Sequence, residues 1–142
     1  MKSPAYLKLI TTQPTAEGLQ ANPLTGIESR VQTVMKVLTS DLQQHHLLED
    51  IAAEVNLCTR QLERLFKIET GFTPMQYLRR VRLEQARELL GHTRLSVKEI
   101  RLEVGMADAS HFTKDFKQEY RVTPREYRAN VQRGRLHVAF RQ

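Results

Sequence analysis

The sequence predicts an all-α protein, and three observations support this. Apolar residues recur at the spacing of a helical face from Ile27 onward, several segments open with helix-capping sequences, and no segment alternates apolar and polar residues as a strand would. A chain of 142 residues is long enough for one domain with its own core and too short for a second domain of similar size.

Composition narrows the possible classes of protein. Lys and Arg number 22 against 16 for Asp and Glu, and the resulting net charge of +6 favours polyanionic partners such as nucleic acid. No stretch approaches the roughly 18 consecutive apolar residues of a membrane span, and no apolar signal sequence follows Met1. The single cysteine, Cys58, cannot close an intrachain disulfide. We therefore expect a cytoplasmic protein with no membrane partner.

The N-terminal part of the chain divides into an arm and a helix. Residues 1–26 hold three of the five prolines and show no sustained periodicity, which predicts a flexible arm. The first helix is predicted to begin at Ile27, where apolar residues start to follow one helical face. These residues are Ile27, Val31, Val34, Met35, Leu38 and Leu42.

Capping sequences mark the helices that follow. Thr73–Gln76 and Thr123–Glu126 each combine a hydroxyl N-cap, a proline at the first helical position and an amide or carboxylate at the third, and Ser96–Glu99 is a further capping box. The helix that opens at Pro74 is predicted to span residues 74–90 and to stop at Gly91. Apolar residues surround most of its circumference, which indicates a central connector with packing partners on both flanks.

An internal repeat is the strongest signal in the sequence. Two upstream apolar positions, Ile51 and Val55, match Ile100 and Val104 at an offset of 49, and the offset becomes 50 downstream. Each copy of such a repeat is one supersecondary unit. The identities at the offset of 50 are Phe66, Lys67, Glu69, Thr73, Pro74 and Tyr77, which recur as Phe116, Lys117, Glu119, Thr123, Pro124 and Tyr127.

Each copy has the pattern of a short helix, a tight turn and a longer helix. Asn56 and Gly105 lie where the short helix must end, and both residue types tolerate a left-handed backbone. This pattern predicts two helix-turn-helix units, at about residues 46–67 and 96–120.

The longer helix of each unit must bury one apolar face, which turns a polar face outward. Arg pairs with guanine, Glu accepts from cytosine, and Lys and hydroxyl groups reach bases or phosphates. A merely solvated charged face is the alternative for either helix alone, but equivalent faces at matching places in a repeat favour binding to double-stranded DNA. The outward residues are Arg60, Glu63, Arg64 and Lys67 in the first copy and Ser110, Thr113, Lys114 and Lys117 in the second.

From about Ile27 to Arg128 the chain resembles the DNA-binding domain of the AraC/XylS family of bacterial transcription regulators. The resemblance implies about seven helices, with two helix-turn-helix subdomains joined by a long central helix. It implies a domain over residues 27–133, a C-terminal tail over 134–142, and recognition helices that enter successive major grooves. The matching stretches include Leu48–Ala52, Arg60–Lys67, Gly71–Pro74, Tyr77–Leu78, Val97–Ile100, Ser110–Phe112, Phe116–Lys117, Thr123–Pro124 and Tyr127–Arg128.

The resemblance also implies roles for single residues. Because Ala109, at a family base-contact position, cannot hydrogen-bond a base, we expect the first recognition helix to supply most sequence discrimination and the second to supply mainly backbone affinity. The expected base contacts are Arg60, Glu63, Arg64, Ser110 and Lys114. The expected phosphate contacts are Thr59, Gln61, Lys67, Arg79, His111, Thr113 and Lys117.

Several residues depart from the family pattern. Cys58 replaces the usual Ser at the N-cap of the first recognition helix, and a thiol accepts poorly, so we expect a cap weaker by about 0.5 to 1 kcal/mol. Arg101 stands where a small buried residue is usual, and Met106 stands where Phe is. Arg121 stands where Gly commonly ends the second recognition helix, and we expect it to distort the approach to Thr123.

The sequence offers little support for an enzyme and leaves other binding functions open. An enzyme is not expected, because the histidines and Cys58 form no catalytic or metal-binding pattern; His45 and His46 precede Cys58 by a spacing that no common zinc site uses. No cofactor is expected. The alternatives are an architectural DNA binder without sequence preference, a module that titrates a partner, and the DNA-binding part of a larger sensor regulator. The resemblance adds RNA polymerase as a partner, and it implies a monomer if the chain is complete and a dimer if it is a fragment.

Overall fold

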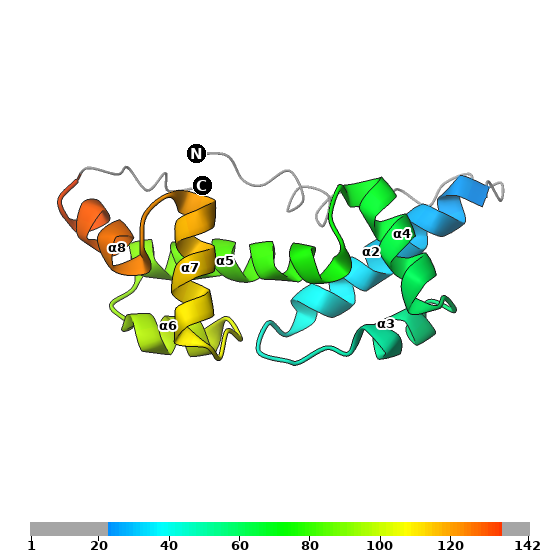
Figure 1. Ribbon diagram of the computed structural model, residues 1–142, viewed down its shortest axis with the longest axis horizontal. Coiled ribbons are helices and arrows are strands. Elements are labelled where there is room, and N and C mark those ends of the chain that lie inside the picture. Colours follow the sequence, from blue (N-terminus) through cyan, green and yellow to red (C-terminus); the bar gives the residue numbers. More distant parts are fainter. Residues whose placement is uncertain (1–22, 135–142) are drawn as a thin grey trace. The chain divides into compact units, whose positions relative to one another are not determined.

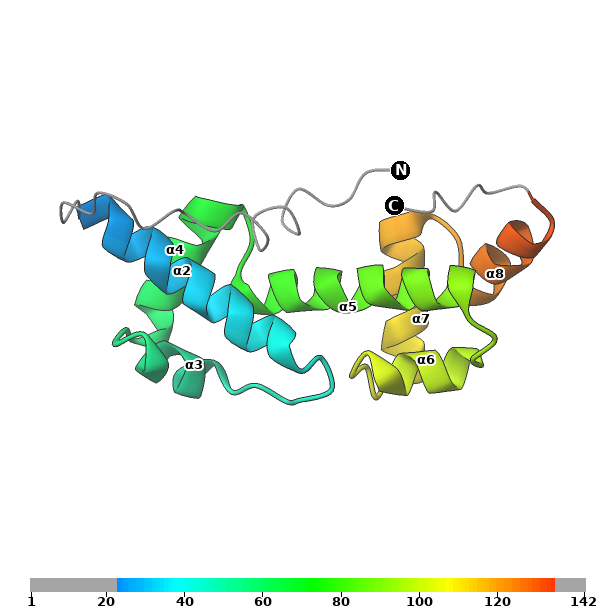
Figure 2. The same ribbon diagram turned by 180° about the vertical axis from the view of Figure 1, so that it is seen from behind.

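The computed structural model describes residues 23–134, which form seven helices and no strand (Figures 1 and 2). The predicted all-α fold is thereby confirmed. The predicted arm up to residue 22 and the tail from residue 135 lie outside the described residues. Within the described part, no helix combines the length and hydropathy needed to cross a membrane. The helices are α2 (Pro23–Ser40), α3 (Leu48–Glu54), α4 (Thr59–Thr70), α5 (Pro74–His92), α6 (Val97–Glu103), α7 (Ala109–Tyr120) and α8 (Pro124–Gln132).

The described residues divide into two compact units. The N-terminal unit comprises residues 23–41 and 46–78, and the C-terminal unit comprises residues 42–45 and 79–134. The first turn of α5 therefore belongs to the N-terminal unit and the rest of that helix to the C-terminal unit. The loop at residues 42–45, which joins α2 to α3, belongs to the C-terminal unit.

The core of the N-terminal unit forms between α2 and the first helix-turn-helix. The rings of Phe66 and Tyr77 are fully buried and meet edge to face, with centroids 5.4 Å apart. Helix α2 begins at Pro23 rather than at Ile27, because proline is well accommodated at the first position of a helix. It ends at Ser40, so the prediction that Leu42 lies on its apolar face is wrong. The other buried residues of this unit are Val31, Val34, Met35, Leu38, Ile51, Ala52, Val55, Leu62, Pro74 and Leu78.

The core of the C-terminal unit forms where α6, α7 and α8 pack on α5 (Figure 2). Helix α5 continues to His92, so Gly91 lies inside it and does not end it as predicted. Carbonyl groups of the last turn have partners beyond Gly91: the hydroxyl of Thr93 donates to Leu89 O at 2.6 Å, and Arg128 Nε donates to Leu90 O at 3.4 Å. This core consists of Leu83, Ala86, Leu90, Ile100, Val104, Phe112, Phe116 and Tyr127.

The predicted capping boxes close the N-termini of α5, α6 and α8. Ser96 N–H donates to Glu99 Oε2 at 2.7 Å, and Glu99 N–H donates back to Ser96 Oγ at 3.1 Å; the same reciprocal pair links Thr123 and Glu126. The hydrogen bonds from Ser96 hold the pKa of Glu99 below its ordinary value, and those from Thr123 do the same for the pKa of Glu126. Both carboxylates are therefore held in their charged form at helix N-termini.

Candidate nucleic-acid interface

The first helix-turn-helix consists of α3, a short turn and α4. Asn56 ends α3 with a left-handed backbone at φ 56°, as its residue type predicted, and Leu57 N–H donates to Ala52 O at 2.9 Å. Leu62 and Phe66, 1% and 0% exposed, fix one face of α4 to the core. The orientation of the opposite face of α4 is thereby set by burial.

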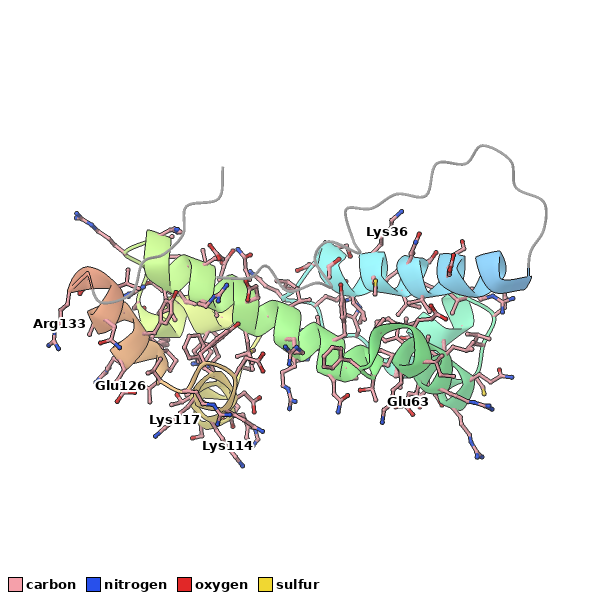
Figure 3. The ribbon with its side chains drawn as sticks, turned by 90° about the horizontal axis from the view of Figure 1, so that it is seen from above. Lys36, Glu63, Lys114, Lys117, Glu126 and Arg133 are labelled. Atoms are coloured by element: carbon pink, nitrogen blue, oxygen red, sulfur yellow. The ribbon has the colours of Figure 1, made fainter. Side chains whose placement is uncertain are left out.

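The opposite face of α4 is polar and exposed. Arg60 and Arg64 are one turn apart, as are Glu63 and Lys67, so the four side chains lie together on the outer side of the helix. Figure 3 shows Glu63 on that side. Within the described residues, none of the four takes part in an ion pair. Their charged groups are available to an external partner. Gln61 is also exposed, and Thr59 is half-buried.

Cys58 is the N-cap of helix α4, as predicted. Its backbone N–H donates to Oε1 of Gln61 at 3.1 Å, which is one half of a capping box. This bond occupies the side chain of Gln61, a predicted phosphate contact. A role for Gln61 at a phosphate therefore falls to its amide nitrogen.

The second helix-turn-helix repeats this geometry with α6 and α7. Gly105 takes the left-handed backbone at φ 79°, and Phe112 and Phe116 are fully buried under α7. Arg101, one of the departures from the family pattern, has a structural use here. Its guanidinium donates to Met106 O at 3.1 Å and also to Ala107 O, which fastens the turn that leads into α7.

The outer face of α7 carries the remaining predicted contacts. Lys114 and Lys117 project from its outer side in Figure 3. The hydroxyl of Thr113 donates to Ala109 O at 2.9 Å, so it keeps only its acceptor function toward a ligand. Arg79, the one predicted contact outside the two recognition helices, is exposed on α5. The exposed predicted contacts of α7 are Ser110, His111, Thr113, Lys114 and Lys117.

Asp108 lies directly before α7, and its role as the N-cap of that helix was not predicted. Its carboxylate caps α7 by accepting the backbone N–H of His111 at 2.8 Å, and it lies 3.8 Å from His111 Nδ1. The hydrogen bond from the His111 backbone, followed by the nearby positive charges, lowers the pKa of Asp108. An acidic residue just before a recognition helix is the signal that identifies such a cap.

Replacing Asp108 by asparagine should make the protein less sensitive to acid. The folded-state pKa of Asp108 is depressed, so the stabilisation by its charge is present above the ordinary carboxyl pKa and is lost as the pH falls through the folded value. Asparagine keeps the cap but carries no charge. In thermal unfolding measured from pH 7 to pH 3, the melting temperature of the wild type should fall further than that of Asp108→Asn. Parallel curves for the two proteins would contradict this.

Arg121 does not distort the end of α7, contrary to the prediction. It adopts φ 68° and ψ 1°, close to the φ 82° and ψ −1° of Gly71 at the end of α4. Its N–H donates to Lys117 O at 2.8 Å, the length of the corresponding bond from Gly71 to Lys67 O. An exposed arginine can take this backbone conformation at a modest energetic cost, so the capping box at Thr123 remains intact.

Replacing Arg121 by glycine should stabilise the protein. Glycine has no Cβ penalty in the left-handed region, so relief of about 1 kcal/mol is expected, reduced in part by the greater flexibility of glycine in the unfolded chain. Urea unfolding monitored by circular dichroism measures the change. As a control, Arg125→Gly, at an exposed position within α8, should destabilise the protein. A loss of stability on Arg121→Gly would show that the left-handed conformation costs nothing here.

Comparison with known proteins places this geometry among DNA-binding domains. The sequence profile of a helix-turn-helix domain matches residues 51–130. The HTH-type transcriptional activator RhaS of Klebsiella pneumoniae (strain 342) is 37% identical over 108 residues, which are 76% of this chain and 39% of that protein. RhaS of Enterobacter sp. (strain 638) is 36% identical over 122 residues, or 86% of this chain and 42% of that protein. The chain thus spans about two fifths of the length of these curated relatives.

Solved structures show the same fold. A transcriptional regulator with an AraC-type DNA-binding domain from Chromobacterium violaceum superposes with a TM-score of 0.68 at 33% identity, covering 75% of this chain and 96% of that one. The DNA-binding domain of the global transcriptional factor AdpA, solved in complex with a target DNA, superposes with a TM-score of 0.67 at 27% identity, covering 75% and 95%.

Proposed function

Since the chain belongs to the AraC/XylS family of helix-turn-helix DNA-binding domains, we propose that it regulates transcription by binding specific double-stranded DNA through α4 and α7. One observation carries the proposal: each of these helices buries an apolar face and leaves a polar face exposed, in two copies of one unit. The solved complex of AdpA with its target DNA supports the same use of the fold. The family is a class of DNA-binding domains and not of enzymes.

We assign the reading of bases chiefly to α4. Arg60 and Arg64 can each pair with guanine through two hydrogen bonds, and Glu63 can accept from cytosine N4. The base-reading residues proposed for α7 are Ser110 and Lys114, which recognise bases less selectively. Most of the sequence preference should therefore come from the half of the site that lies under α4.

A second set of residues is proposed to hold the DNA backbone. Lys67 and Lys117 occupy equivalent places in the repeat, and Arg79 adds a further exposed cation on α5. Contacts to phosphate fix the register of a protein on the duplex and make affinity depend on salt. The remaining proposed phosphate contacts are Thr59, Gln61, His111 and Thr113.

Selection of bound duplexes from a random pool tests the proposal. A regulator with two recognition helices should enrich one defined site with two major-groove segments, and it should hold that site against excess random duplex. No enrichment, together with equal competition by random duplex, would overturn the proposal and support the architectural alternative. Lack of any binding to duplex DNA would leave the partner-titrating alternative.

The role in transcription rests on the relatives. The RhaS proteins are transcriptional activators by name, so we propose that this chain acts as an activator in the cytoplasm and contacts RNA polymerase. Two recognition helices in one chain allow a monomer to occupy an asymmetric site. The curated relatives are longer than this chain, which is consistent with the alternative of a DNA-binding part of a larger regulator.

A further inference from the structure

The last turn of α7 is tied to α5 by two consecutive residues, all within the C-terminal unit (Figure 1). Glu119 forms a two-pronged ion pair with Arg80 of α5, with Oε1 2.9 Å from Nη2 and Oε2 3.3 Å from Nη1. The next residue, Tyr120, donates its hydroxyl to Oε2 of Glu84 at 3.1 Å. The C-terminal end of the second recognition helix is therefore held by polar side chains as well as by its apolar face.

Glu84, Arg87 and Tyr120 form one cluster, which we call the α5–α7 cluster. Arg87 forms an ion pair with Oε1 of Glu84, and its guanidinium carbon lies 5.1 Å from the centre of the Tyr120 ring. The same ring lies 4.7 Å from that of Phe116 in the core. Glu84 and Arg87 are only 8% and 7% exposed. Both carboxylate oxygens of Glu84 thus have a partner inside the unit.

A buried ion pair is a poor way to gain stability, since well-packed apolar residues of similar size are often as stabilising. The pair instead constrains the geometry with which the two helices pack. Apolar contacts such as those of Phe112 and Phe116 tolerate sliding and rotation, whereas hydrogen bonds in a low-dielectric interior are satisfied only over a narrow range of geometry. The α5–α7 cluster therefore restricts the angle at which α7 can lie on α5.

The equivalent position in the first repeat is built differently. Thr70 stands 50 residues before Tyr120, and its hydroxyl donates to carbonyls of its own segment, Phe66 O at 2.7 Å and Phe72 O at 3.0 Å. These local bonds close the end of α4 without reaching α5. The polar anchoring to the central helix is thus a property of the second recognition helix.

We propose that the α5–α7 cluster is a positioning device, which sets the angle of α7 and so the alignment of Ser110 and Lys114 with the bases. This rests on the proposed function, since it presumes that α7 reads DNA. Ser110 lies about 15 Å along the helix from Tyr120 at 1.5 Å per residue, so a tilt of about 5° at the anchored end moves Ser110 by about 1 Å. A displacement of that size is enough to spoil a base contact.

The test compares two hydroxyl deletions at equivalent places in the repeat. Tyr120→Phe removes the bond to Glu84 and keeps the ring against Phe116 and Arg87, and the matched control Thr70→Val removes only local bonds. Dissociation constants are measured for the selected site, for variants mutated in either half, and for random duplex. Tyr120→Phe should weaken binding to the selected site about 5-fold. The variant should lose discrimination between correct and mutated bases in the half of the site under α7 only, and its binding to random duplex should be unchanged. Thr70→Val should leave discrimination in the α7 half at the wild-type value.

A second variant distinguishes loss of the hydrogen bond between Tyr120 and Glu84 from loss of folding. Glu84→Gln also weakens the ion pair with Arg87, so it should lose at least as much of the discrimination as Tyr120→Phe. Adding Tyr120→Phe to Glu84→Gln should cost less discrimination than Tyr120→Phe costs alone, because both variants affect the same hydrogen bond. A folded Tyr120→Phe protein with wild-type discrimination would overturn the inference, as would an equal loss in both halves or on random duplex. Wild-type protein that does not discriminate at all would refute the proposed function instead.

Discussion

Replacing Gly105 by alanine should destabilise the protein by about 3 kcal/mol or more, because two costs add at this position. Gly105 has φ 79°, a region that strains any residue with a Cβ. A Cβ placed there would also overlap the carbonyl oxygen of Leu42 and lie 2.9 Å from its carbonyl carbon and 3.0 Å from Gln43 Cα. Forcing atoms into a packed site costs about 1 to 3 kcal/mol in addition to the backbone strain.

The loop against Gly105 has little freedom to yield. Arg82 on α5 donates from Nε to Leu42 O and from Nη2 to Gln44 O, both at 3.0 Å, so the backbone of the loop is held to α5. The guanidinium of Arg82 is partly removed from water, and this burial lowers the pKa of Arg82 from its ordinary value. Relief of the overlap would therefore have to break at least one of these hydrogen bonds.

Gly71 provides the matched control for this prediction. Its φ is 82°, but nothing lies within 4 Å of the place where a Cβ would be added. Gly71→Ala should therefore cost only the left-handed strain, about 1 to 2 kcal/mol. Urea denaturation of both variants measures the difference. Equal losses would mean that the loop moves away from Gly105 without cost, contrary to the contacts described.

The second large effect concerns the reading of DNA. Arg64→Ala should cost about 1 to 3 kcal/mol of discrimination against the wrong base at the positions that Arg64 contacts, and it should relax the preference there. The side chain is exposed and forms no ion pair among the described residues, so the fold should be unaffected. Dissociation constants for the selected site and for single-base variants give the discrimination directly.

Lys117→Ala is the contrasting variant. A lost phosphate contact should weaken binding to all sequences alike and should reduce the slope of log K against log salt by about 1. Lys117 is exposed on α7, so its removal should also leave the fold unchanged. If Arg64→Ala and Lys117→Ala change specificity equally, the division of roles between the two residues is wrong.

The helices could be predicted from the sequence to within a few residues because their signals are local. The capping residues Thr73, Ser96 and Thr123 act within one helical turn, and each makes the hydrogen bonds that its sequence predicted. The misplaced boundaries have an equally physical cause. Helix α5 extends past Gly91 because Thr93 and Arg128 donate hydrogen bonds to its last carbonyl groups. Arg128 lies far from Gly91 in the sequence, so its contribution could not be predicted from the residues around Gly91.

The candidate interface was predictable for the same reason. Burial of Phe66 and Phe116 fixes which side of each recognition helix faces outward, and helical periodicity then places the charged residues there. The distortion expected at Arg121 was wrong, because only the tertiary structure shows that this helix end accommodates an arginine in the left-handed region, which its residue type disfavours. Whether each exposed residue contacts a base or a phosphate remains a prediction.

By itself the sequence determined the helical class, the duplicated helix-turn-helix and the polar face that each copy turns outward, since these depend on spacing and capping over a few residues. Only the tertiary structure decided how residues far apart meet: Gly105 against Leu42, and Tyr120 against Glu84. Such pairs produce no recurring pattern in the sequence, because their geometry depends on the packing of whole helices. Their contacts hold the second recognition unit in place.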